Sequence, residues 1–139
     1  MKKCLYLAAA ITQYETEGYR CAAAHAQELA KRLDLEFIPA HSAWRSTAEW
    51  LDRWPGFVKR VGAFCVFHSG GPQRMTPGVW AEVRDAIHRN IPIYIASASG
   101  VKGPYAIRLG CLHPVPGEPL PVAGYRLQHI NKEAIINET

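Results

Sequence analysis

Residues 4–11 read CLYLAAAI, an unbroken apolar run. A run of this kind is typical of a strand that is covered on both faces, as in a parallel sheet. Residues 63–67 read AFCVF and form a second such run. Because neither run would be stable at an exposed edge, we expect the two strands to lie side by side at the centre of a sheet.

Helical patterns separate these strands. Residues 19–33 follow a helical period, with alanines and leucines on one stripe and charged residues outside it. Residues 46–49 (STAE) have the capping-box pattern that opens a helix. Pro55 and Gly56 interrupt this second helix, so we expect a kink or a break near Trp54.

The third helix and two further strands complete the alternation. Thr76 followed by Pro77 marks a helix start, a hydroxyl cap with proline at the first helical position, and the pattern runs to about Arg89. Residues 35–39 and 91–96 read as short strands. Strands that alternate with helices in this way predict a parallel sheet with right-handed crossovers.

The pattern changes after the fourth strand. Six of the ten prolines fall between Pro92 and Pro121, so residues 97–124 are expected to form a Pro/Gly-rich loop or lid. Residues 125–130 alternate enough to predict a last strand at a sheet edge, and residues 131–139 read as a tail.

Together these elements predict one α/β domain over residues 1–139. The expected architecture is a flavodoxin-like or Rossmann-like three-layer sandwich with about five mostly parallel strands in the order 2-1-3-4-5. In such open sheets, ligands bind at the carboxyl ends of the strands where the strand order reverses. In this chain that place is formed by residues 9–13 and 68–76, which include Ala9 and His68.

Composition narrows the range of partners and compartments. The formal net charge is +4, but the basic residues are scattered, which argues against a polynucleotide partner and suits a small anionic ligand. No stretch reaches the ~18 apolar residues that a membrane helix needs. The four cysteines form no C-x-x-C pair, and Cys4 and Cys65 sit in apolar runs, so we expect reduced thiols and a cytoplasmic protein.

Motifs for common cofactors are not found. There is no G-x-S-x-G, Walker or G-x-G-x-x-G motif, which argues against hydrolases of that type, NTPases and classical dinucleotide enzymes. The six histidines show no metal-ligand spacing. We therefore expect neither a metal nor a cofactor.

The segment most suggestive of chemistry is residues 76–83, TPGVWAEV. Glu82 falls about 60° to one side of the apolar stripe of its helix, so we expect its carboxylate at the rim of a crevice. Gly78, one turn earlier, would leave room for a sugar ring. Trp80 lies near the loop, where it could stack on a base, and Glu82 could equally be a solvated surface residue.

Tyr6-Leu7-Ala8, the spacing Gly78-x-x-x-Glu82 and the strand near Ile91 resemble the nucleoside 2-deoxyribosyltransferase-like superfamily. This group includes nucleoside deoxyribosyltransferases and nucleotide N-glycoside hydrolases. The resemblance covers Leu5 to about Ala96. It implies that Glu82 is the nucleophile that attacks the anomeric carbon, that Tyr6 lies near it, and that the protein is a homo-oligomer.

The residue types suit cleavage of an N-glycosidic bond. A carboxylate can stabilise an oxocarbenium-like state or form a covalent glycosyl intermediate. The backbone N–H groups of Ser69, Gly70 and Gly71 could hold a 5′-phosphate. His68, which follows the third strand, is a candidate general acid.

The chain also departs from the family pattern. Ala9 stands where the first strand usually ends in glycine, and Gly62 stands where the third strand usually begins with aspartate. A further aspartate of the family has only the displaced Asp52 as its nearest match. Two functions follow: an enzyme that cleaves or transfers the N-glycosidic bond of a nucleoside or nucleoside 5′-monophosphate, or a non-catalytic module that binds a nucleotide-like ligand.

Overall fold

The computed structural model describes residues 2–69, 77–105, 121–122 and 125–126. Five strands of this part form one sheet in the order β2-β1-β3-β4-β5. Strands β2, β1, β3 and β4 are parallel, and β5 is antiparallel to β4. The strands are β1 (Cys4–Ala8), β2 (Glu36–Pro39), β3 (Val61–Phe67), β4 (Ile93–Ser97) and β5 (Gly100–Tyr105). The predicted α/β class, the strand order and the central pair β1 and β3 are confirmed.

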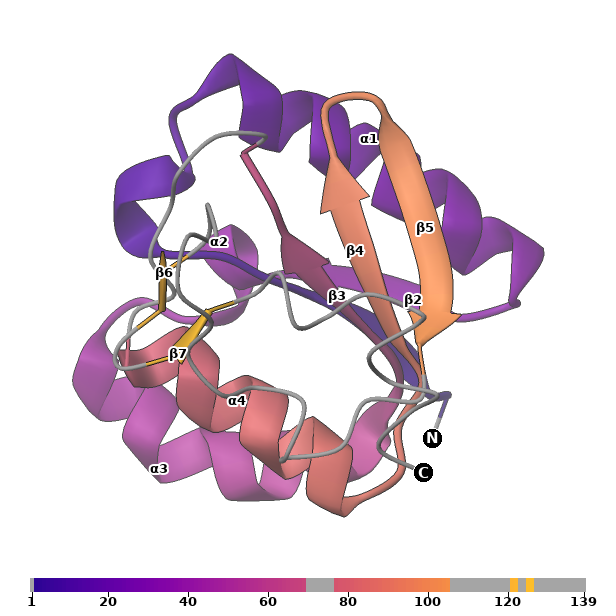
Figure 1. Cartoon of the computed structure of the whole chain (residues 1–139). Helices are drawn as coiled ribbons and strands as arrows, with labels where there is room; N and C mark the ends of the chain where they lie inside the picture. Colours follow the sequence, from indigo (N-terminus) through magenta and orange to yellow (C-terminus); the bar gives the residue numbers. More distant parts are fainter. Residues whose placement is uncertain (1, 70–76, 106–120, 123–124, 127–139) are drawn as a thin grey trace.

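Helices cover both faces of this sheet (Figure 1). Helix α1 (Glu17–Arg32) lies on one face, and α3 (Thr47–Phe57) and α4 (Pro77–His88) lie on the other. Three shorter helices join the main elements: α2 (Ala40–Ala43) and the 3₁₀ helices η1 (Ile11–Gln13) and η2 (Val58–Arg60). The arrangement is the predicted three-layer sandwich.

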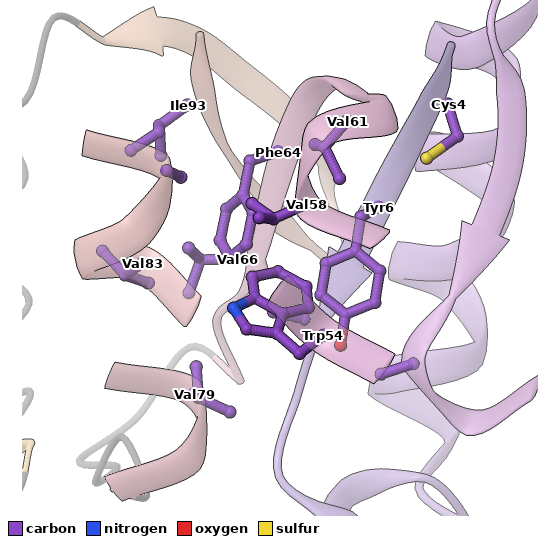
Figure 2. Close-up of a cluster of buried hydrophobic side chains, with 13 residues drawn as sticks. Cys4, Tyr6, Trp54, Val58, Val61, Phe64, Val66, Val79, Val83 and Ile93 are labelled. Carbon is purple, nitrogen blue, oxygen red and sulfur yellow. The ribbon is translucent and has the colours of Figure 1, made fainter. Parts of the chain in front are cut away.

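Alternation along the central strands divides the core into two clusters, one on each face. Tyr6 and Phe64 pack with Trp54 and Val83 in what we call the α3/α4 cluster (Figure 2). Leu5 and Leu7 point the other way and join the α1 cluster, as do Cys65, Phe67, Tyr19 and Ala26. All five residues of β1 are buried. The strand is apolar throughout because it has no exposed face.

Helix α3 begins as the capping-box pattern predicts. The Ser46 hydroxyl accepts a hydrogen bond from the Glu49 N–H at 3.1 Å. The expected break near Trp54 is wrong, because α3 continues through Pro55 to Phe57 before η2 follows. Pro55 lies in the last turn, where it removes a single backbone N–H, and buried Trp54 anchors this turn in the core.

Replacing Ser46 by Ala should lower the free energy of unfolding by about 1 kcal/mol, because the Glu49 N–H would lose its side-chain acceptor. Urea denaturation of the wild type and the variant would measure the difference. Thr47→Ala, at the neighbouring exposed position, serves as the control. Equal effects of the two substitutions would contradict the capping role.

The carboxyl-terminal third differs from its prediction. Within the expected loop 97–124, residues Gly100–Tyr105 form β5, which pairs with β4. Gly103 permits this close pairing, since a Cβ there would lie 3.1 Å from the Ile93 carbonyl oxygen, at a φ of +128°. Of the predicted edge strand 125–130, the structure describes Tyr125–Arg126, which form β7 and pair with β6 (Pro121–Val122) instead of with the large sheet.

The remaining carboxyl-terminal predictions concern residues outside the described part of the chain. These are residues 106–120, 123–124 and 127–139, which include the predicted tail 131–139 and most of the predicted loop. The sequence nevertheless misplaced the fifth strand. The segment GVKGPY reads as a loop because of its glycines and proline, and pairing with β4 overrides that local preference.

Candidate active site

Tyr6 and Glu82 meet on the face of the sheet that α3 and α4 cover. Tyr6 lies in the middle of β1, and Glu82 lies in the second turn of α4. The Tyr6 hydroxyl donates a hydrogen bond to Glu82 Oε2 at 2.5 Å. The sequence placed these two residues together across 76 positions of the chain, and this proximity is confirmed.

The expected rim position of Glu82 is wrong. Its exposed fraction is 3 %, and that of Tyr6 is 0 %. Glu82 lies to one side of the apolar stripe of its helix, as expected. That side is nevertheless not open to solvent, because Trp50 of α3 lies against the carboxylate. Glu82 is the only polar or charged residue classed as buried in the described part of the chain. Such a residue needs hydrogen-bond partners, because an unpartnered buried carboxyl is costly.

Two tryptophans supply further hydrogen bonds. Trp50 Nε1, from α3, donates to Glu82 Oε2 at 2.8 Å. Trp44 Nε1, which follows α2, donates to the Tyr6 hydroxyl at 3.0 Å. These hydrogen bonds form one network. Trp44 donates to Tyr6, Tyr6 donates to Glu82, and Trp50 also donates to Glu82.

Sequence reasoning missed the roles of these tryptophans. The helical spacing of Trp50 indicates only a core position, and nothing next to Trp44 in the sequence indicates an acceptor for its indole N–H. A signal did exist, since a tryptophan that is largely buried usually finds an acceptor for its indole N–H. A chain with four tryptophans therefore needs buried or half-buried acceptors. Trp54 follows the same rule, since its Nε1 donates to Asp85 Oδ2 at 2.8 Å.

Burial controls the protonation of this network. Burial raises the pKa of Glu82 to about 8, although the hydrogen bonds from Tyr6 and Trp50 lower it; the charge of nearby Asp85 raises it. Burial also raises the pKa of Tyr6 well above its usual value, so the phenol keeps its proton and acts as a donor. At neutral pH Glu82 is therefore largely protonated in the free protein.

The other predicted catalytic residue, His68, follows directly after β3. The backbone N–H of His68 donates a hydrogen bond to the Ala96 carbonyl at 2.8 Å, which continues the ladder between β3 and β4. If the alternation of β3 continues by one residue, position 68 has the same orientation as Phe64 and Val66, which belong to the α3/α4 cluster. Burial lowers the pKa of His68. The neutral ring that this favours suits accepting a proton better than donating one.

The predicted binding residues are only partly brought together. Gly78 lies beside Trp50, whose ring would be 3.9 Å from a Cβ at that position. Trp80 is half-buried against the α3/α4 cluster. Ala9 belongs to the α1 cluster, on the opposite face from Tyr6. Ser69 is exposed at the end of the same segment as His68, and Gly70 and Gly71 lie outside the described residues.

The described residues contain neither a cluster of metal ligands nor a membrane-spanning helix. No three His, Cys, Asp or Glu side chains among them lie close enough to hold a metal ion. No helix in this part of the chain is both long and apolar enough to cross a membrane.

Comparison with known proteins adds no further assignment. No family model, no curated protein and no solved structure matches this chain. The function must therefore be argued from the geometry of the site.

Proposed function

We propose that this protein cleaves or transfers the N-glycosidic bond of a nucleoside or nucleoside 5′-monophosphate, with Glu82 as the nucleophile. The observation that carries the proposal is the placement of hydrogen bonds on one carboxylate oxygen. Tyr6 and Trp50 both donate to Oε2, and among the described residues no hydrogen bond ends on Oε1. Oε1 is the oxygen available to attack an anomeric carbon, while Oε2 is held in place.

Burial suits this chemistry. In a site from which water is excluded, a carboxylate interacts more strongly with the positive charge that develops on the sugar. That positive charge in turn favours the ionised form of Glu82. Tyr6 and Trp50 stabilise the same form, since each of their hydrogen bonds lowers the pKa of Glu82. The nucleophile is thus held mostly neutral in the free protein. It must lose its proton to solvent before the reaction, and the carboxylate then stabilises the positive charge that develops on the sugar in the transition state.

His68 completes the proposed catalytic set. As a mostly neutral ring near the carboxyl end of β3, it would accept a proton from the water that attacks the glycosyl ester in the second step. Ser69, Gly70 and Gly71 are proposed to hold the 5′-phosphate through their backbone N–H groups. Gly78 would make room for the sugar, and Trp80 would contact the ligand.

We also propose a cytoplasmic, homo-oligomeric protein that needs no metal or cofactor. The described cysteines Cys4, Cys21 and Cys65 are all free thiols, which suits a reducing compartment. The oligomer follows from the family resemblance.

The proposal is tested by incubating the protein with a panel of nucleosides and their 5′-monophosphates, followed by chromatography for free base. We expect release from at least one substrate, faster from the monophosphate than from its nucleoside. If the wild type binds a nucleotide but releases no base from any of them, the enzyme is excluded and a binding module of the same fold takes its place. A second free base added to the reaction distinguishes a transferase, which makes a new nucleoside, from a hydrolase.

A further inference from the structure

A second hydrogen-bonded pair lies at the carboxyl ends of the strands. The Tyr19 hydroxyl and His41 Nδ1 are 2.8 Å apart. Tyr19, on α1, is 1 % exposed, whereas His41, on α2, is exposed. Their rings meet nearly at right angles, with centroids 5.5 Å apart. A buried, fixed tyrosine therefore orients a histidine that solvent and ligand can reach.

The segment that begins with α2 connects His41 along the chain to the Glu82 network. Strand β2 pairs with β1 up to Leu7 and Pro39, and α2 follows immediately. Trp44, three residues after His41, donates to Tyr6, which donates to Glu82. One short segment thus carries both His41 and a member of the network.

Tyr14 links the two groups from the other side. Its ring centroid lies 6.0 Å from that of His41, and the ring packs against both core clusters at the end of the sheet. Burial, followed by the charge of Glu82, raises the pKa of Tyr14 to about 12. Tyr14 therefore packs beside His41 and also reaches the α3/α4 cluster, to which Tyr6 belongs.

The hydrogen bond with Tyr19 determines which histidine nitrogen can react. Nδ1 is occupied, so Nε2 is the nitrogen left for a ligand. A tyrosine hydroxyl both donates and accepts, so it can partner Nδ1 whether or not that nitrogen carries a proton. The pair can hold the ring in one orientation while Nε2 loses and regains a proton.

We infer that His41 is the general acid that protonates the leaving base, a role that rests on the proposed function. Glu82 reacts as its carboxylate, after its proton has passed to solvent. In the first step, its Oε1 forms a bond to the anomeric carbon as the bond from that carbon to the base nitrogen breaks. The electron pair of the broken bond goes to the base, and the base takes a proton from Nε2 of the His41 imidazolium. Neutral His41 regains its proton from bulk water, which its exposure allows.

A pair of substrates that differ in their need for a proton tests this role. Guanosine 5′-monophosphate loses an anionic base unless the base is protonated, whereas the cationic ring of 7-methylguanosine 5′-monophosphate leaves as a neutral base. We expect His41→Gln to slow base release from the first substrate about 100-fold or more. Release from the second should change little. Tyr19→Phe should show the same selectivity with a smaller loss, since the ring remains but the orienting hydroxyl is gone.

Two control variants separate the possible failures. His25→Gln, at an exposed α1 histidine whose ring is hydrogen-bonded to the Ala98 carbonyl, should leave release from both substrates unchanged. Glu82→Gln should abolish both reactions. Equal losses on the two substrates, or no loss, in His41→Gln would overturn the general-acid role while the proposed function stands. If the wild type cleaves neither substrate, both the function and this role fail for guanine nucleotides.

Discussion

Replacing Glu82 by Gln should reduce base release by at least about a thousandfold, equivalent to roughly 4 kcal/mol of lost transition-state stabilisation. The amide keeps the size and shape of the side chain. Its oxygen can still accept from Tyr6 and Trp50, so the network of hydrogen bonds should survive. The amide nitrogen that takes the place of Oε1 cannot form the ester with the anomeric carbon.

The measurement is the rate of base release at saturating substrate, with ligand binding followed separately by calorimetry. Binding should change far less than turnover, because the protein at neutral pH already holds Glu82 largely neutral. Asp85→Asn is the matched control, one turn further along α4 and hydrogen-bonded by Trp54 in the same way as Glu82 is by Trp50. It should keep most of the activity. Unchanged turnover in Glu82→Gln would exclude Glu82 as the nucleophile.

The stability of the protein should fall by a few kcal/mol between pH 5 and pH 8.5 because of Glu82, since each pKa unit corresponds to about 1.36 kcal/mol. The pKa of Glu82 is about 8 in the folded protein, compared with 4.5 for an unperturbed glutamate side chain. The folded state therefore binds the Glu82 proton more tightly than the unfolded state. This contribution is complete below the unfolded pKa and is lost as pH rises through the folded pKa.

The difference between wild type and Glu82→Gln isolates this effect, because all other titrating groups are shared. At pH 5 the two proteins should have similar free energies of unfolding, since the amide mimics the neutral acid. At pH 8.5 the variant should be the more stable of the two. Glu28→Gln, at an exposed position on α1, should leave the pH dependence as it is. Parallel pH curves for wild type and Glu82→Gln would show that Glu82 is not a buried acid with a raised pKa.

A Glu82 carboxylate at the rim of a crevice, in contact with solvent, would give a different dependence of stability on pH. A solvated Glu82 would change stability by about half a kcal/mol or less on substitution, at any pH. The two positions of the side chain thus predict different pH dependences, and urea denaturation at two pH values separates them.

The sequence was informative wherever a local pattern carried the signal. The apolar runs at β1 and β3 predicted a central parallel pair, because such runs are stable only when both faces are covered. The fold in turn brought Tyr6 and Glu82 together. The strand β5 was missed, because its glycines and proline favour a loop when read alone and only pairing with β4 makes them a strand.

What the sequence by itself determined was the sheet and its order, whereas the nearness of Tyr6 to Glu82 came from the family resemblance. Only the tertiary structure decided that Glu82 is buried, protonated at neutral pH and held by Trp50, and that Tyr19 orients His41. The physical reason is that burial and hydrogen bonding depend on side chains that converge from distant segments. Trp50 is 32 positions from Glu82, Trp44 is 38 positions from Tyr6, and no periodicity within one helix records either contact.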